Sequence, residues 1–184
     1  MVKAFFGHLR NILVHKFWVC YFGRKLGLGW WRCLIHDMSK FSPIEFWESV
    51  KYYQGTSSPI PACKKEKGYS KAWQHHKGRN PHHYEYWTDN YDAGTTLIPM
   101  PFDCVVEMIA DWCAAGRTYQ GEAWTIQSQS EWWENKKKMK PSIHQDTIKI
   151  LDCFFAPSFT WYANEDPFDW WKTNKSFVKN FYVS

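Results

Sequence analysis

Five of the eight histidines lie in three short stretches, and these stretches carry residue types that bind metal ions. They are His36, which precedes Asp37, the pair His75–His76 and the pair His82–His83. Imidazole nitrogens and carboxylate oxygens, without thiolates, suit a borderline divalent ion such as Mn, Fe, Co, Ni or Zn. Neighbouring residues of a helix point about 100° apart, so one histidine of each pair would face a given ion. The other would be an outer partner, a ligand of a second ion or a proton donor.

Two expected helices add further ligand candidates. Apolar residues recur at helical spacing from Phe5 to Phe22, and His15 shares one stripe with several of them. Asp111 lies close to the apolar face of the clearest predicted helix, Phe102 to Ala115. A carboxylate there is costly unless it is paired or bound to a cation. Each of these side chains alone is more often an ordinary hydrogen-bonded group, and only the ordered set predicts a metal centre of one or two ions.

The remaining elements that position these residues are also expected to be helices. A helix over 43–53 would begin with Ser42 as its cap, Pro43 in the first turn and Glu45 completing a capping box. Gly116 would end the helix that carries Asp111. Further helices are predicted over 71–76, from Asn80 through the second histidine pair, over 130–139 and over 142–155. Residues 56–68 and 89–101 read as loops. No segment alternates with period two, so the predicted fold class is all-α.

The composition limits the classes of protein that this chain can be. Its 184 residues carry a formal net charge of +5, and basic side chains interrupt the apolar N-terminal segment. No run reaches the ~20 apolar residues that span a bilayer, and no secretory apolar region of about 7–15 residues is present. We therefore expect a cytoplasmic protein with no membrane partner. The six cysteines are scattered without a C-x-x-C motif, which indicates reduced thiols.

The length predicts one compact domain over residues 1–156 and an extension over 157–184. The extension holds Trp161, Trp170 and Trp171, so we expect it to pack on the domain or to form a homo-oligomer contact. The basic runs Lys64–Lys67 and Lys136–Lys138 are typical of solvated faces, and duplex nucleic acid is not the favoured partner.

The order His, His-Asp, His, His, Asp resembles the HD-domain superfamily of all-α, metal-dependent phosphohydrolases. The stretch His36-Asp-Met-Ser-Lys40 is similar to its frequent HD-x-G-K stretch, with Ser39 in place of glycine. Longer motifs resemble DUF5662, an uncharacterised bacterial and phage family, across about residues 5–155. These motifs are 36–47, 51–55, 68–73, 75–87, Met100–Pro101 and 107–112.

The HD-domain resemblance implies a single helical bundle with a two-part metal site. His15, His36, Asp37 and Asp111 would hold the first ion, and Asp37 would bridge to a second. His76, with His82 or His83, would complete the second part. The long interval between Asp37 and His75 departs from the superfamily pattern.

The function expected from these residues is hydrolysis of a phosphoester in a small substrate, a nucleotide or cyclic nucleotide. Asp37, Lys40 and His83 are the predicted catalytic residues, with a spare histidine protonating the leaving oxygen. Lys40, Lys77 and Arg79 would neutralise the phosphate, and Tyr119 would stack on a base.

Two alternatives use the same residues. An HD-type di-iron oxygenase would use extra histidine ligands, and a non-catalytic protein would bind a nucleotide or a partner around a structural metal. A phage-encoded protein would do either in the host cytoplasm.

Overall fold

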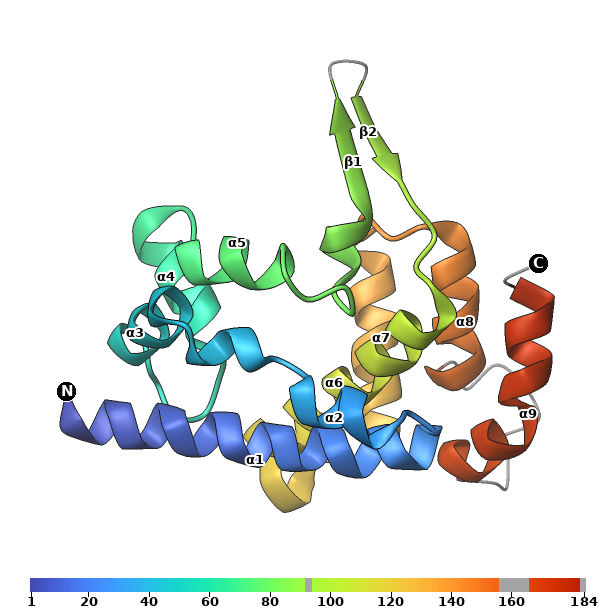
Figure 1. Cartoon of the computed structure of the whole chain (residues 1–184), viewed down its shortest axis with the longest axis horizontal. Coiled ribbons are helices and arrows are strands. Elements are labelled where there is room, and N and C mark those ends of the chain that lie inside the picture. The colour runs from blue at the N-terminus through green and yellow to red at the C-terminus, as the bar shows by residue number, and fades with distance from the viewer. Residues whose placement is uncertain (92–93, 156–165, 183–184) are drawn as a thin grey trace.

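The computed structural model describes residues 1–91, 94–155 and 166–182, which form a mostly helical protein (Figure 1). The helices are α1 (Val2–Leu26), α2 (Trp30–Ile35), α3 (Pro43–Lys51), α4 (Pro59–Lys67), α5 (Lys71–Lys77), α6 (Phe102–Gln120), α7 (Ile126–Lys138), α8 (Gln145–Phe155) and α9 (Pro167–Tyr182). Three short 3-10 helices are η1 (Met38–Phe41), η2 (Tyr84–Trp87) and η3 (Gly121–Ala123). The strands β1 (Thr88–Tyr91) and β2 (Gly94–Leu97) form an antiparallel hairpin. The predicted helical character is confirmed, and the hairpin is an addition to it.

Helices α1 and α6 pack against each other and carry the central part of the fold. The buried residues of α1 recur every three or four positions, which gives the helix one inward face. It ends at Gly27, whose φ of 86° is the left-handed conformation that commonly closes a helix. Helix α6 is buried on nearly all sides through its first three turns, and its buried residues include the polar Glu107 and Asp111.

Two apolar clusters meet along α1. The larger joins the C-terminal half of α1 to α6, α7, α8 and α9 and includes Val19. The smaller contains Ile12 of α1 with Phe46 and Val50 of α3. His15 lies between Ile12 and Val19 on the same buried face of α1. The polar residues therefore gather where the two apolar clusters adjoin.

Helix α9 brings aromatic residues of the C-terminal extension into the larger cluster. Phe168 and Trp171 are buried, and Trp171 stacks on Phe102 of α6 with ring centroids 5.8 Å apart. The helix packs on α8 and on α1. Trp161, predicted to belong to the same packing, lies outside the described residues.

Two predicted boundaries are wrong for identifiable reasons. Residues 56–68, predicted as a loop, contain α4, whose first residue Pro59 follows the capping residue Ser58. Proline suits this first turn because its missing N–H has no partner there. Helix α6 continues past Gly116 to Gln120. A Cβ atom at Gly116 would collide with the Trp124 indole, so this glycine allows close packing and does not end the helix.

Two short segments also differ from expectation. Residues 89–101 contain the β1–β2 hairpin, whose side chains are mostly exposed and so show no apolar alternation. His82 and His83 lie in a turn and not in a helix. Asn80 fixes this turn, because its amide nitrogen donates to Ser39 Oγ and to the His76 carbonyl oxygen, both at 2.8 Å.

No helix in the described part of the chain has both the length and the apolar character needed to cross a bilayer. Five of the six cysteines are buried, and Cys20 is half-buried.

Candidate metal centre

Asp37 lies at the centre of the candidate site and is fully buried. It follows α2 with a φ of 56°, a left-handed conformation that aspartate adopts more readily than most residues. Lys16 of α1 holds the preceding segment, because its Nζ donates to the carbonyl oxygens of Leu34 (3.0 Å) and His36 (2.6 Å). The end of α2 is thereby tied to α1 immediately before the Asp37 carboxylate.

One set of side chains, which we call the first ligand group, comes from α1, the end of α2 and α6. It consists of His15, His36, Asp37 and Asp111, and one potential ligand atom of each lies within 4.8 Å of the others. His15 Nε2 is 3.0 Å from Asp111 Oδ1 and 3.5 Å from Asp37 Oδ2. His36 Nε2 is 3.2 Å from Asp37 Oδ2 and 3.5 Å from Asp111 Oδ1. Four residues predicted to act together are thus brought together.

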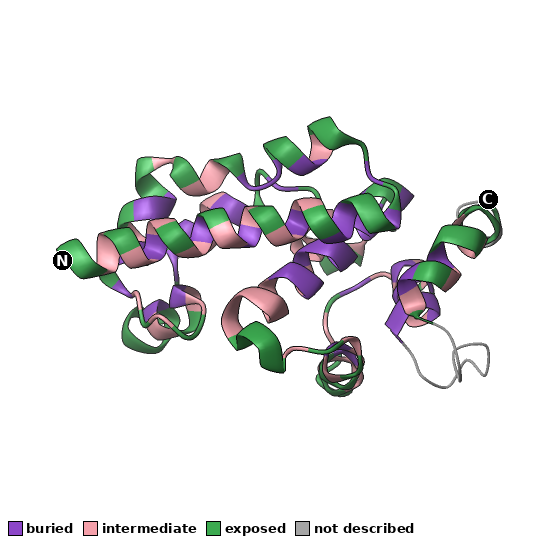
Figure 2. Ribbon diagram, turned by 90° about the horizontal axis from the view of Figure 1, so that it is seen from below, coloured by how far each residue is buried: buried purple, intermediate pink, exposed green. Residues whose placement is uncertain are grey.

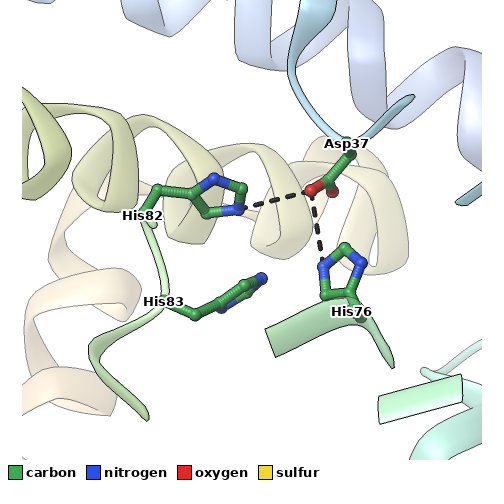
Figure 3. Close-up of side chains that lie close together, drawn as sticks. All are labelled: Asp37, His76, His82 and His83. Atoms are coloured by element: carbon green, nitrogen blue, oxygen red, sulfur yellow. Dashed lines mark ion pairs between the residues drawn. The ribbon is translucent and has the colours of Figure 1, made fainter. Parts of the chain in front are cut away.

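The second ligand group uses the other oxygen of the same aspartate (Figure 3). It consists of Asp37, His76, His82 and His83, again with ligand atoms within 4.8 Å. Asp37 Oδ1 lies 3.4 Å from His76 Nε2 and 3.3 Å from His82 Nε2. The sequence left open which histidine of each pair would face a metal ion. In the structure His76 of the first pair belongs to the group, and both His82 and His83 of the second pair belong to it. The two oxygens of Asp37 therefore face different groups.

Several of these ligand atoms are buried without a hydrogen-bond partner among the described residues. They are His15 Nε2, His36 Nε2, His82 Nε2, His83 Nε2 and Asp37 Oδ1. Burying polar atoms unsatisfied is costly, and such atoms are rare in folded proteins. Their donor types, imidazole and carboxylate, fit a divalent transition-metal ion. The residues present therefore fit the metal that the sequence predicted.

Glu107 of α6 orients two of the histidines and was missed as a functional residue. Its Oε1 lies 2.9 Å from His36 Nδ1 and 3.3 Å from His82 Nδ1, and Arg32 Nε donates to its Oε2 at 2.5 Å. A carboxylate on one imidazole nitrogen leaves the other free to bind a metal. Glu107 and Asp111, four residues apart on α6, are both buried.

Glu45 of α3 does the same for the second group. Its two oxygens lie 2.8 Å from His76 Nδ1 and 2.5 Å from His75 Nδ1. The predicted capping box is therefore wrong: α3 begins at Pro43, but the Ser42 side chain makes no capping hydrogen bond and the Glu45 carboxylate points to the histidines. His75, the outward member of its pair, is a partner of Glu45.

The electrostatics of the first group favour positive charge at its centre. Burial alone would raise the pKa of Asp37, but the charges of His36 and Lys40 outweigh it and hold that pKa well below its usual value. Burial likewise opposes ionisation of Asp111, yet contacts with His15 and His36 keep its pKa well below normal. The pKa of His36 is raised well above its usual value against burial, chiefly by Asp37. A metal cation would satisfy the same carboxylates.

The pKa of His83 is shifted in the opposite direction to that of His36. Burial and the neighbouring charge of His82 lower the pKa of His83 well below its usual value, which favours the neutral imidazole. His83 belongs to the second ligand group by position, and its role as a proton donor stays a prediction.

A cavity of about 180 Å³ opens beside both ligand groups. His15 and Asp111 of the first group and His76 and His83 of the second line it together with Lys40. Its remaining walls are largely apolar and aromatic and include Ile12, Ile60, Trp73 and Tyr119. Lys40 Nζ lies 2.6 Å from Asp37 Oδ2, which places its charge at the cavity wall beside the shared ligand.

The residues predicted to bind the substrate lie in different parts of the structure. Lys40 and Tyr119 line the cavity as expected. Lys77 and Arg79 are not among its lining residues, and Arg79 is exposed in the turn after α5. The adjacency of these two residues to the histidine pairs did not place them in the cavity: Lys77 is the half-buried last residue of α5, and Arg79 is exposed in the turn that follows.

The long motifs of the sequence agree with a comparison against known families. Searches of curated proteins and of solved structures found no match. The profile of a family of unknown function, DUF5662, matches residues 4–156, which include every member of both ligand groups. The chain belongs to the DUF5662 family.

Proposed function

We propose that this protein is a metal-dependent phosphohydrolase acting on a nucleotide or cyclic nucleotide. The observation that carries the proposal is the placement of Asp37, whose two oxygens each face a separate group of ligand atoms beside one cavity. A bridging carboxylate between two ions is a recurrent arrangement in enzymes that hydrolyse phosphoesters. The order of the ligands along the chain also resembles that of HD-domain phosphohydrolases.

The ligand groups, Lys40 and the two outer glutamates would each have a separate role in the proposed reaction. His15, His36, Asp37 and Asp111 would hold one divalent ion, and His76, His82, His83 and Asp37 a second. Such ions polarise a phosphoryl oxygen and lower the pKa of bound water towards neutrality. Lys40 would contact a phosphate oxygen, since its ammonium group lies at the cavity wall beside Asp37. Glu107 and Glu45 would keep the ligand histidines oriented.

The cavity favours a substrate with a single phosphate group. Apart from the proposed ions, the described residues that line it offer one lysine, Lys40, and no arginine, so a single ammonium group is available to a phosphate. Trp73 and Tyr119 provide aromatic surface on which a nucleobase can stack. A nucleoside monophosphate or a cyclic nucleotide meets both conditions.

The test is hydrolysis by protein loaded with Mn or Ni, measured as phosphate release from a panel of nucleoside monophosphates and as formation of the monophosphate from a panel of cyclic nucleotides. We expect turnover that disappears in Asp37→Asn and persists in Lys65→Gln, a matched change on an exposed face of α4. Protein that binds two ions per chain and remains inert across the panel would overturn the proposal. Tight nucleotide binding without turnover would instead support the non-catalytic alternative.

The second ligand group gives one alternative specific support. Three histidines and one shared carboxylate form a nitrogen-rich set that also suits iron. A di-iron oxygenase would consume oxygen when loaded with Fe(II) in air, whereas a hydrolase would release phosphate equally under nitrogen. Oxygen uptake and phosphate release therefore separate the two functions.

A further inference from the structure

The first 36 residues carry six lysines and arginines and no acidic residue. The other 148 residues hold 17 basic and 18 acidic side chains, so the whole positive net charge of the protein resides in α1 and α2. Four of the six basic residues, Lys3, Arg10, Arg24 and Lys25, are exposed. These two helices therefore present a positively charged surface.

The same helices expose an unusual number of apolar side chains. On α1 a stripe at helical spacing contains Phe6, Leu13, Phe17 and Tyr21, on the side opposite to His8, Ile12 and His15. Figure 2 shows exposed residues recurring along α1. On α2 the exposed residues are Trp30 (62%), Trp31 (73%), Leu34 (54%) and Ile35 (47%). Contiguous apolar surface of this kind marks an interaction site.

The exposed apolar and basic side chains of α1 and α2 form one face, which we call the outer face. Phe17 and Tyr21 of α1 and Trp30 of α2 line one open hollow of about 560 Å³ together with Arg24 and Lys25. The Arg24 guanidinium lies over the Trp30 ring at 4.8 Å, and Lys25 Nζ lies 5.3 Å from the Tyr21 ring centroid. Cations and aromatic rings are thus interleaved within a single surface.

We propose that the outer face binds the surface of a membrane that contains anionic lipids. Tryptophan with leucine and isoleucine between exposed lysines and arginines is the composition of helices that lie in the interface of a bilayer. Binding would be peripheral, with α1 and α2 parallel to the surface and the ligand groups on the opposite side of α1. This inference revises the expectation of no membrane partner, which rested on the absence of a spanning segment.

Two other occupants fit the outer face less well. A second copy of the chain would place cations of one face against those of the other, which is repulsive. A nucleic acid would satisfy the cations and could stack on tryptophan, but its phosphates offer nothing to Leu13, Leu34 and Ile35. Acyl chains and anionic headgroups match both kinds of residue.

The experiment is co-sedimentation of the full chain with vesicles of phosphatidylcholine alone or with about 30% phosphatidylglycerol added. We expect binding to the anionic vesicles only. The variant R24Q/K25Q should bind about thirtyfold more weakly, since each cation near an anionic surface contributes about 1 kcal/mol. W30A/W31A should lose binding even at low salt. The matched controls K65Q/K71Q and Y69A/Y86A, on other exposed surfaces, should bind as the natural chain does.

Equal binding by the controls and the outer-face variants, or no sedimentation with either vesicle, would overturn the proposal. So would a dimer in light scattering that W30A/W31A dissociates, or RNA binding with the same dependence on both variants. Circular dichroism checks that each variant folds, and if W30A/W31A does not, R24Q/K25Q still decides the outcome. Metal content and phosphate release are independent of these results.

Discussion

The two ligand groups share Asp37 but are built from different kinds of structure. The first joins His15 of α1 and Asp111 of α6, the two helices that form the centre of the fold. The second takes His76 from the short helix α5 and His82 and His83 from the stretch between α5 and η2, where Asn80 holds a turn. Long packed helices fix side chains more rigidly than a turn does.

The ligand atoms differ as well. The first group offers two carboxylates and two histidines, and the second offers three histidines and the shared carboxylate. Carboxylate oxygens favour Mn²⁺, whereas imidazole nitrogens favour Fe²⁺, Ni²⁺ and Zn²⁺. We therefore expect the two ligand groups to bind their ions with unequal affinity. Metal binding in the first group should depend more strongly on an intact fold.

The largest effect is expected from Asp37→Asn, which removes the charge common to both groups. Asparagine tolerates the left-handed backbone at this position, so the fold should persist. Metal content measured by mass spectrometry should fall from two ions per chain to none, and phosphate release should drop by roughly a thousandfold or more. Retention of both ions would show that Asp37 is not the shared ligand.

Asp111→Asn should affect the first group alone. Its Oδ1 lies 3.0 Å from His15 Nε2 and 3.5 Å from His36 Nε2, and both histidines belong to the first group. We expect loss of one ion and retention of the second, seen as a single remaining transition in a metal titration. Loss of both ions would mean that the groups fill cooperatively.

His82→Gln gives the converse result. It removes a ligand atom at 3.3 Å from Asp37 Oδ1 but also a partner of Glu107. The second ion should dissociate while the first remains, and Ni²⁺ or Zn²⁺ affinity should fall more than Mn²⁺ affinity. His75→Gln is the matched control, because His75 contacts Glu45 and belongs to neither group.

Glu107→Gln should weaken metal binding in both groups without abolishing it. Glu107 contacts His36 of the first group and His82 of the second, so both imidazoles lose their carboxylate partner. Changes to such outer partners typically cost about 10- to 100-fold in metal affinity. Glu45→Gln, whose contacts are to His76 and His75, should affect the second ion only.

The smallest effect concerns His8, which lies in the cavity wall outside both groups. Burial and the nearby charge of Lys40 lower its pKa to about 4, against 6.5 in the unfolded chain. As pH falls below 6.5, His8 becomes protonated in the unfolded state but stays neutral in the folded state, so the free energy of unfolding decreases. Between pH 7 and 5.5 this loss should be about 1 kcal/mol, and His8→Asn should remove it in urea unfolding curves. Equal pH dependence in both proteins would contradict the assignment.

The sequence was informative where a polar residue interrupted an apolar stripe. His15 and Asp111 stood out because their neighbours on α1 and α6 pointed inward, and the structure places both in the first group. Glu107 and Glu45 could not be recognised in this way. Their partners lie 71 and 31 residues away in the chain, and a carboxylate near a helix start or at i,i+4 has a local explanation.

The histidine pairs show a second reason. His82 and His83 both belong to the second group because of the path of the chain between α5 and η2, which is fixed by contacts of Asn80 with Ser39 and His76. The same turn directs Arg79 outward. Local periodicity contains no information on these long-range contacts, whereas the helical character of the long segments depends on periodicity alone.

Lys16 joins two parts of the molecule that have been described separately. Its ammonium group contacts the carbonyl oxygens of Leu34 and His36. Leu34 belongs to the outer face, and His36 belongs to the first ligand group. A ligand docked on Leu34 and Ile35 would lie beside the segment that carries His36 and Asp37. If docking is stronger when the ions are bound, metal affinity must rise by the same factor on docking, because such coupling is reciprocal. The segment 34–37 would then act as an allosteric link four residues long.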